Sequence, residues 1–258
     1  MLPLSSLALG LALLALALPA RAADPFEIQV YDATANDPGR FGLEVHTNFV
    51  GSGLKAAVAP EYPQHHQAHL TFEPSFGVTE WLELGGYLQF ALRDGTEADF
   101  AGFKLRAKLV TPHSFSEHWR LGLNFEFSRL PDTYDRARNG GELRPIVAWE
   151  SDRFLFAANP IVGLAFDGAG LQFEPAAKAM VKFGHLGVGL EYYTSLGAIT
   201  GFDPFREQEH ALFQVVDIVG LEPLERNLGV GEGLTRGSNN LVFKVIFGWS
   251  FGARASGG

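Results

Sequence analysis

Charged side chains recur at every second position in several stretches of the sequence. The clearest run is "AGFKLRAKL", in which Lys104, Arg106 and Lys108 alternate with apolar residues. Side chains two residues apart in a β-strand lie on one face, so these three bases would form a positive stripe. Such a stripe attracts anions when it lines a water-filled tube. The same alternation predicts further members of this polar, lumen-lining face: Glu44, His46, Glu73, Glu83, Arg120, Glu126, Glu142, Arg144, Glu174, Lys178, Lys182, Glu191 and Lys244.

Acids and bases are nearly balanced on this face, which leaves two interpretations open. The bases could line a path for solutes, or the charges could form cross-strand ion pairs that satisfy a polar wall. For any single residue we favour the ion-pair interpretation, because a lumen must be polar whether or not a solute passes.

Other reactive residues form no recognisable site. The stretch "PQHHQAH" holds His65, His66 and His69, and clustered imidazoles can bind zinc or copper. No cysteine or second carboxylate lies beside them, so a solvated loop is favoured. No Ser-His or Asp-His motif is recognisable, and "GVGEG" from Gly229 lacks the helix and GK[ST] of a phosphate loop. The sequence therefore predicts no catalytic residue, no cofactor, no metal ligand and no enzymatic activity.

The elements that would position the polar face are long alternating segments. In "RFGLEVHTNFV" (40–50) apolar residues alternate with small or polar ones, and most other segments also run to about nine to twelve residues. Tilted strands that cross a bilayer have this length, whereas strands of soluble proteins are commonly about five or six residues long. We count twelve segments: 40–50, 67–78, 82–92, 100–110, 119–129, 141–150, 153–165, 171–183, 186–195, 208–218, 225–234 and 240–251.

This count predicts an all-β fold, a transmembrane antiparallel up-and-down β-barrel of about 12 strands over residues 40–251. The sheet must close because lipid offers no partner to an unpaired strand edge. Every second connection is short, as is typical of periplasmic turns, and the others include long outer loops. The four tryptophans then all fall at the periplasmic end, where an indole ring favours the membrane interface: Trp81, Trp119, Trp149 and Trp249.

The start of the chain has the character of a signal peptide. An apolar run from Leu7 to Leu18 precedes Ala20-Arg21-Ala22, which predicts a signal peptide over residues 1–22 that is removed near Ala22. Without Arg21 the chain has 19 basic and 29 acidic residues, a net charge of −10, which disfavours nucleic acid as a partner. No later apolar run has the roughly 18 residues that a transmembrane helix needs, and the chain has no cysteine for disulfides.

Two segments flank the predicted barrel. Residues 23–39 are expected to form a periplasmic N-terminal extension or a short extra strand, with a partial lumen plug as a further alternative. Residues 252–258 form a C-terminal tail. The strand that ends at Phe251 resembles the C-terminal signal through which barrel-assembly machinery recognises outer-membrane barrels, although most such chains end at the aromatic residue.

Some features fit the barrel less well. The alternation is weak in 208–218 and 225–234. Four prolines within the predicted strands each remove a backbone donor, and bulges at these points would shift the register of everything beyond them: Pro74, Pro145, Pro160 and Pro175.

Several stretches carry a resemblance to known proteins. "EIQVYDATANDPGRFGLEVHTNFV", "ELRPIVAWESDRFLFAANPIV", "FEPAAKAMVKFGHLGVGLEYY" and "QEHALFQVVDIV" resemble a group of uncharacterised proteobacterial outer-membrane β-barrel proteins, over nearly the whole mature chain. "FEPSFGVTEWLELGGYLQF" is more loosely similar to hairpins of outer-membrane transporters associated with the degradation of aromatic compounds. The resemblance implies a place in the bacterial outer membrane.

The sequence thus predicts an outer-membrane channel or transporter that passes small solutes without catalysis, with outer-membrane lipid as its surroundings. Two alternatives stay open. One is a closed structural or adhesion-type barrel that acts through its extracellular loops, and the other is a hydrolase with its site at the barrel rim. The oligomeric state and the solute are not indicated.

Overall fold

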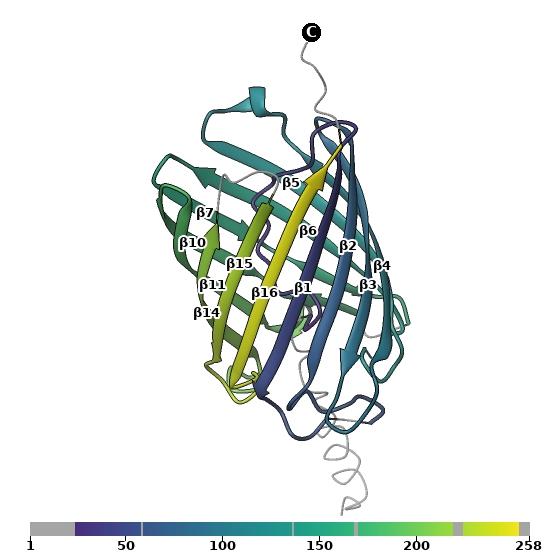
Figure 1. The fold of residues 1–258 in the computed structure, drawn as a ribbon. Helices are drawn as coiled ribbons and strands as arrows, with labels where there is room; N and C mark the ends of the chain where they lie inside the picture. Colours follow the sequence, from purple (N-terminus) through teal and green to yellow (C-terminus); the bar gives the residue numbers. More distant parts are fainter. Residues whose placement is uncertain (1–23, 58, 136, 168–169, 219–223, 253–258) are drawn as a thin grey trace, which may run out of the picture.

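The computed structural model describes residues 24–57, 59–135, 137–167, 170–218 and 224–252, which form a barrel of β-strands (Figure 1). One short 3-10 turn, η1 (His113–Phe115), precedes β5. The strands are β1 (Phe41–Ser52), β2 (Ala68–Thr79), β3 (Leu82–Leu92), β4 (Asp99–Val110), β5 (Trp119–Arg129), β6 (Asn139–Glu150), β7 (Phe154–Asn159), β8 (Val162–Ala165), β9 (Gly170–Phe173), β10 (Ala176–Phe183), β11 (Leu186–Ser195), β12 (Gly197–Ala198), β13 (Gly201–Phe202), β14 (Glu209–Ile218), β15 (Leu224–Gly233) and β16 (Leu241–Phe251).

The strands close into one antiparallel barrel. Each of β1 to β5 pairs with the next strand in sequence, and β1 also pairs with β16, which joins the two ends of the sheet. Three barrel strands are each divided into two elements. The first consists of β7 and β8, which both pair with β6. The second consists of β9, which pairs with β8, and β10, which pairs with β7, and the third consists of β11 and its continuation β12. The short β13 forms a hairpin with β12. The predicted closed barrel of twelve antiparallel strands is therefore confirmed.

The outer surface of the barrel is apolar, and much of its inner surface is polar. On β1, Phe41 and Phe49 are 50% and 42% exposed, whereas His46 and Asn48 between them are 0% and 1% exposed. Leucines repeat this outward exposure on β3 and β4, with Leu105 at 59%. An apolar belt of this extent suits contact with hydrocarbon rather than with water.

Three of the four strand prolines lie side by side. Extending the pairing of β6 with β7 and β8 places Pro145 opposite Pro160. Extending the pairing of β10 with β7 and of β9 with β8 places Pro160 opposite Pro175. The missing donors therefore share one gap in the wall, and the ladder resumes beyond it.

The pairing keeps its register across these prolines and across Pro74, so the register shifts expected there do not occur. Shifts occur elsewhere, between Val50 and Ser52, between Gly77 and Thr79, and between Gln89 and Phe90.

The two ends of the barrel differ. At the terminal end, which is the upper end in Figure 1, β1 begins and β16 ends. All four tryptophans lie at this end. The short connections predict that this end faces the periplasm. The loop end carries the longest connections, including 53–67 and 130–138. Among the described residues, no helix has the length and apolar character needed to span a membrane.

Candidate functional site in the barrel lumen

Residues 24–40, here called the N-terminal segment, run through the lumen from the loop end to the terminal end. Phe26 lies against His69 near the loop end, whereas Asn36 donates hydrogen bonds to Glu83 and Ser75 near the other end. No strand is assigned to these residues. The segment lies in the lumen, where inward-facing side chains of the barrel bind its backbone and its acids.

Phe26 anchors the segment at the loop end. Its side chain is 1% exposed, and its ring lies 4.7 Å from that of His69 and 5.8 Å from that of Tyr134. Thr71 Oγ1 donates to the Phe26 carbonyl at 3.0 Å. Tyr134 in turn donates to Asp99, and burial together with this hydrogen bond raises the pKa of Tyr134 to about 12. The Tyr134 phenol therefore stays protonated over the physiological pH range and remains a donor at the loop end.

Tyr31 anchors the middle of the segment. Its backbone N–H donates to Asn159 Oδ1 at 2.7 Å, and Asn159 Nδ2 donates back to the Tyr31 carbonyl at 2.9 Å. Its hydroxyl donates to Glu27 at 2.8 Å and lies 2.6 Å from the hydroxyl of Tyr87. The Arg144 guanidinium lies 4.3 Å from the Tyr31 ring centroid, a cation–π geometry. The segment is therefore fixed on both sides of the lumen.

The segment brings three carboxylates to the bases of the wall. Lys104 Nζ lies 2.5 Å from Asp24 and 3.3 Å from Glu27. Arg144 lies 3.4 Å from the other oxygen of Glu27, and Arg120 lies 3.1 Å from Asp32 at the terminal end. Residues 24–34 contain no lysine or arginine, so charge complementarity holds the segment in the barrel.

The predicted stripe of Lys104, Arg106 and Lys108 lies inside the barrel but carries no unpaired base. Arg106 contacts Glu73 at 2.9 Å and Glu83 at 2.7 Å. Lys108 contacts Glu83 at 2.9 Å, and Lys104 contacts Glu126 at 3.0 Å. Each of the three bases therefore forms an ion pair with at least one acid of the barrel wall.

A glycine explains how Arg106 reaches Glu73, which lies two strands away. A Cβ on Gly85 of the intervening β3 would lie 3.0 Å from the Arg106 guanidinium. The missing side chain therefore leaves the space through which Arg106 crosses the strand.

A second group of ion pairs lies on the strands from β10 to β16. Glu191 contacts Lys178 at 3.1 Å and also contacts Lys244. Lys178 contacts Asp217 at 2.5 Å. Lys244 Nζ donates to the Ile28 carbonyl at 2.9 Å, so this group also holds the N-terminal segment.

The remaining candidates from the sequence occupy separate positions. Glu142 contacts Arg144 at 2.5 Å. Lys182 contacts Glu150 at 2.5 Å near the terminal end. Glu174 lies between β9 and β10, where Ser195 Oγ is 3.5 Å from its carboxylate, apart from the groups that hold the segment. Glu44 and His46 lie beside Glu73.

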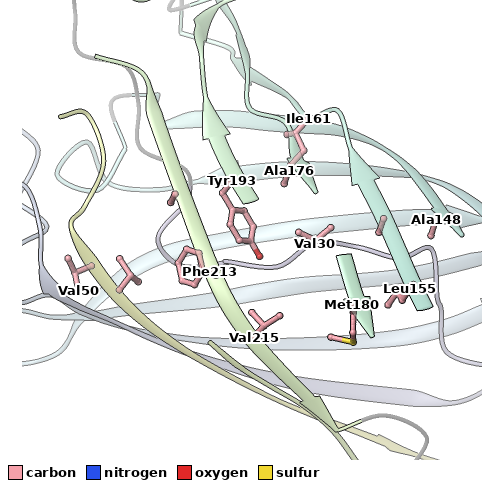
Figure 2. Packing of buried hydrophobic residues seen from close by; sticks show 13 residues of the cluster. Val30, Val50, Ala148, Leu155, Ile161, Ala176, Met180, Tyr193, Phe213 and Val215 are labelled. Atoms are coloured by element: carbon pink, nitrogen blue, oxygen red, sulfur yellow. The ribbon is translucent and has the colours of Figure 1, made fainter. Parts of the chain in front are cut away.

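One side of the lumen is apolar, which the alternation did not predict. Val30 of the segment lies among inward side chains that include Tyr193, Phe213, Val215 and Met180 (Figure 2). On β14 the inward-facing Ala211, Phe213 and Val215 are apolar, whereas Gln214 is exposed on the outside. Glycines make room here, since a Cβ on Gly231 would lie 2.4 Å from the Phe213 ring. The "GVGEG" glycines therefore serve packing.

Sequence reasoning also missed several polar members of the site. Tyr87 follows the same alternation as Glu83, and Tyr193 the same as Glu191, so their inward position was available from the pattern. Asp24, Glu27 and Asp32 belong to a stretch that alternates only over residues 27–30, and no local signal places them in a lumen.

A cavity of about 300 Å³ lies beside the segment. Its walls carry both charges and are lined in part by Tyr31, Asp32, Lys108, Glu150, Lys182 and Arg226. Its contents must therefore be compatible with charged and hydrogen-bonding groups.

The three histidines of "PQHHQAH" do not converge. The rings of His65 and His66 stack at 3.9 Å in the loop between β1 and β2, with His66 3.2 Å from Asp94. His69 faces the lumen and binds Gln67 at 2.7 Å.

Replacing Phe26 tests the anchor at the loop end. We expect Phe26→Ala to accelerate hydrogen exchange of the amides of residues 26–31 several-fold, because the variant loses the ring contacts and leaves a void. Mass spectrometry of the detergent-solubilised protein measures this exchange. Phe41→Ala, on the outer face of β1, is the matched control. Unchanged exchange in Phe26→Ala would show that Phe26 does not anchor the segment.

No protein-family model matches the sequence, and no curated protein matches it. Solved structures are similar in fold. The KdgM porin is 10% identical with a TM-score of 0.55, covering 82% of this chain and 99% of the porin. A KdgM porin in complex with disordered oligogalacturonate gives a TM-score of 0.52 at 10% identity over the same shares. An outer-membrane channel from Pseudomonas putida F1 is 12% identical with a TM-score of 0.56, covering 87% of this chain and 100% of the channel. The chain therefore shares the barrel fold of outer-membrane channels.

Proposed function

We propose that this protein is a channel of the bacterial outer membrane that passes small solutes, with a path narrowed by the N-terminal segment. The observation that carries the proposal is a charged cavity beside a separate chain segment inside a closed barrel. A barrel of about eight strands can be filled by its own side chains, whereas twelve strands enclose more space. Here a linear segment, held by ion pairs and hydrogen bonds, occupies part of that space.

The two sides of the lumen bear on the class of solute. The strands from β1 to β6 present mainly polar and charged groups, whereas β7 and the middle of β14 present apolar groups such as Leu155, Phe213 and Val215. A small solute with both a polar group and an apolar part fits such a path. The KdgM complex with oligogalacturonate supports entry of a solute into a barrel of this fold.

A location in the outer membrane implies lipid and assembly machinery as partners. Outer-membrane lipid would surround the apolar belt, the signal peptide over residues 1–22 would be removed on export, and barrel-assembly machinery would recognise the strand that ends at Phe251. Residues 1–22 lie outside the described residues. We infer no enzymatic step, because charged side chains that converge in the lumen, such as Lys104, Arg106 and Lys178, are engaged in ion pairs.

A closed structural or adhesion-type barrel is the second candidate, and the ion-paired, occupied lumen favours it. Single-channel recordings in planar bilayers separate the two candidates. We expect the full mature chain to give small but discrete conductance steps and to support slow swelling of liposomes in small amphipathic solutes. Silent bilayers together with non-swelling liposomes would reject the channel and leave the closed barrel.

A further inference from the structure

Glu44, His46 and Glu73 form a cluster of potential metal ligands on the inner wall of β1 and β2. Glu44 and Glu73 are direct cross-strand partners. His46 Nε2 lies 3.0 Å from Glu73 Oε2 and 3.6 Å from Glu44 Oε2. One donor atom from each residue lies within 4.8 Å of the others. Two carboxylates directly opposite each other repel, so this arrangement calls for a positive charge between them.

The surroundings orient each donor. Arg106 binds the other oxygen of Glu73, Oε1, at 2.9 Å and leaves Oε2 for the cluster. Gln29 Nε2 donates to Glu44 Oε2 at 3.0 Å. His46 Nδ1 has no hydrogen-bond partner among the described residues, so the ring interacts through Nε2, the atom that faces both carboxylates. Such neighbours of the ligands are what orients a metal-binding carboxylate.

We propose that Glu44, His46 and Glu73 bind a divalent transition-metal ion of the Zn²⁺ type. Imidazole nitrogen and carboxylate oxygen are both ligands of this ion, with bonds of about 2.0 Å. Ligand atoms of a tetrahedron with such bonds lie about 3.3 Å apart, close to the two distances from His46 Nε2. The ion takes the place of the His46–Glu73 hydrogen bond and supplies the positive charge between the carboxylates.

The cavity gives this site access and a fourth ligand position. Glu44 and Gln29 line the 300 Å³ cavity, and the Glu44 side chain is 29% exposed, whereas His46 and Glu73 are buried. An ion that arrives through the cavity therefore meets Glu44 first. The position opposite the three protein ligands faces the cavity and takes a water molecule, as in zinc sites with three protein ligands. The site does not depend on solute passage.

Zinc titration of the refolded full chain by isothermal calorimetry tests the site, with Co²⁺ absorption as a second readout. We expect one bound Zn²⁺ per chain and a tetrahedral Co²⁺ spectrum. His46→Gln should lower the affinity by at least about tenfold, since even the loss of an outer partner costs about 10- to 100-fold. His69→Gln is the matched control, because His69 is a buried lumen histidine outside the cluster that hydrogen-bonds to Gln67, and this variant should bind zinc as the wild type does.

A double variant, His65→Asn with His66→Asn, removes the stacked imidazoles of the loop and should also bind as the wild type does. Loss of zinc binding in this double variant, with retention in His46→Gln, would place the ion in the loop and overturn the proposal. Absence of zinc binding to the wild type would overturn it as well. Both readouts measure binding, so they are distinct from failure of the proposed channel, which conductance measures.

Discussion

A protein that lacks residues 24–34 is expected to conduct ions at least an order of magnitude better than the full chain. These residues carry Phe26 and Tyr31, the two aromatic anchors of the N-terminal segment. The strands of the wall hydrogen-bond to one another, so the barrel can close without the segment. Removing it merges its volume with the 300 Å³ cavity. Single-channel recording in planar bilayers measures the change.

The same deletion should shift the ion preference toward anions. It removes Asp24, Glu27 and Asp32 and no base, so Lys104 loses two of its acidic partners and Arg120 loses one. The lumen becomes more positive, and positive charge in a narrow tube attracts anions. Reversal potentials in a salt gradient show the shift.

A triple variant separates charge from volume. Asp24→Asn, Glu27→Gln and Asp32→Asn keep the segment but remove its charges, so the ion preference should move while the conductance rises less than in the deletion. A deletion that folds, as judged by circular dichroism, yet conducts no better than the full chain would show that the segment does not limit the path.

A charged side chain on the apolar belt is expected to destabilise the barrel more strongly the closer it lies to the bilayer centre. Leu105 lies near the middle of β4 and is 59% exposed on the outer face. Leu105→Arg should lower the free energy of unfolding in lipid vesicles by about 2–4 kcal/mol, because it would place a guanidinium near the bilayer centre. Urea titration followed by tryptophan fluorescence measures this loss.

Leu92→Arg is the matched control for this experiment. Leu92 is 48% exposed at the loop end of β3, where the same charge can reach the interface and should cost about 0–1 kcal/mol. Equal losses for the two variants would contradict a membrane around the belt.

The sequence predicted the architecture because alternation is a local property. In β1 through β5 one face is apolar and the other polar, so the pattern alone assigns Phe49 outward and His46 inward. On β14 the pattern fails, since Phe213 and Val215 face inward and pack near Val30 of the segment. In the middle of β14 apolar residues lie on both faces for different reasons, with lipid outside Val216 and the segment inside Val215.

The contacts of the site could not be predicted in the same way. The Arg106–Glu73 ion pair spans two strands over Gly85, and its formation depends on a register that the sequence does not reveal. The segment alternates over only four residues, 27–30, and its partners lie far away in the chain, as Asn159 does for Tyr31. Its place in the lumen depends on many hydrogen bonds and ion pairs with distant strands.

The position of the N-terminal segment has a consequence for the order of assembly. The segment is continuous with β1, and β1 pairs with β16 to close the barrel. With residues 1–22 removed as proposed, the free end of the segment would lie at the loop end, close to Phe26. Either the hairpins wrap around the segment before the first and last strands meet, or that free end must thread the whole length of a finished tube. Wrapping needs no such passage, so the plug and the wall would be built in a single event.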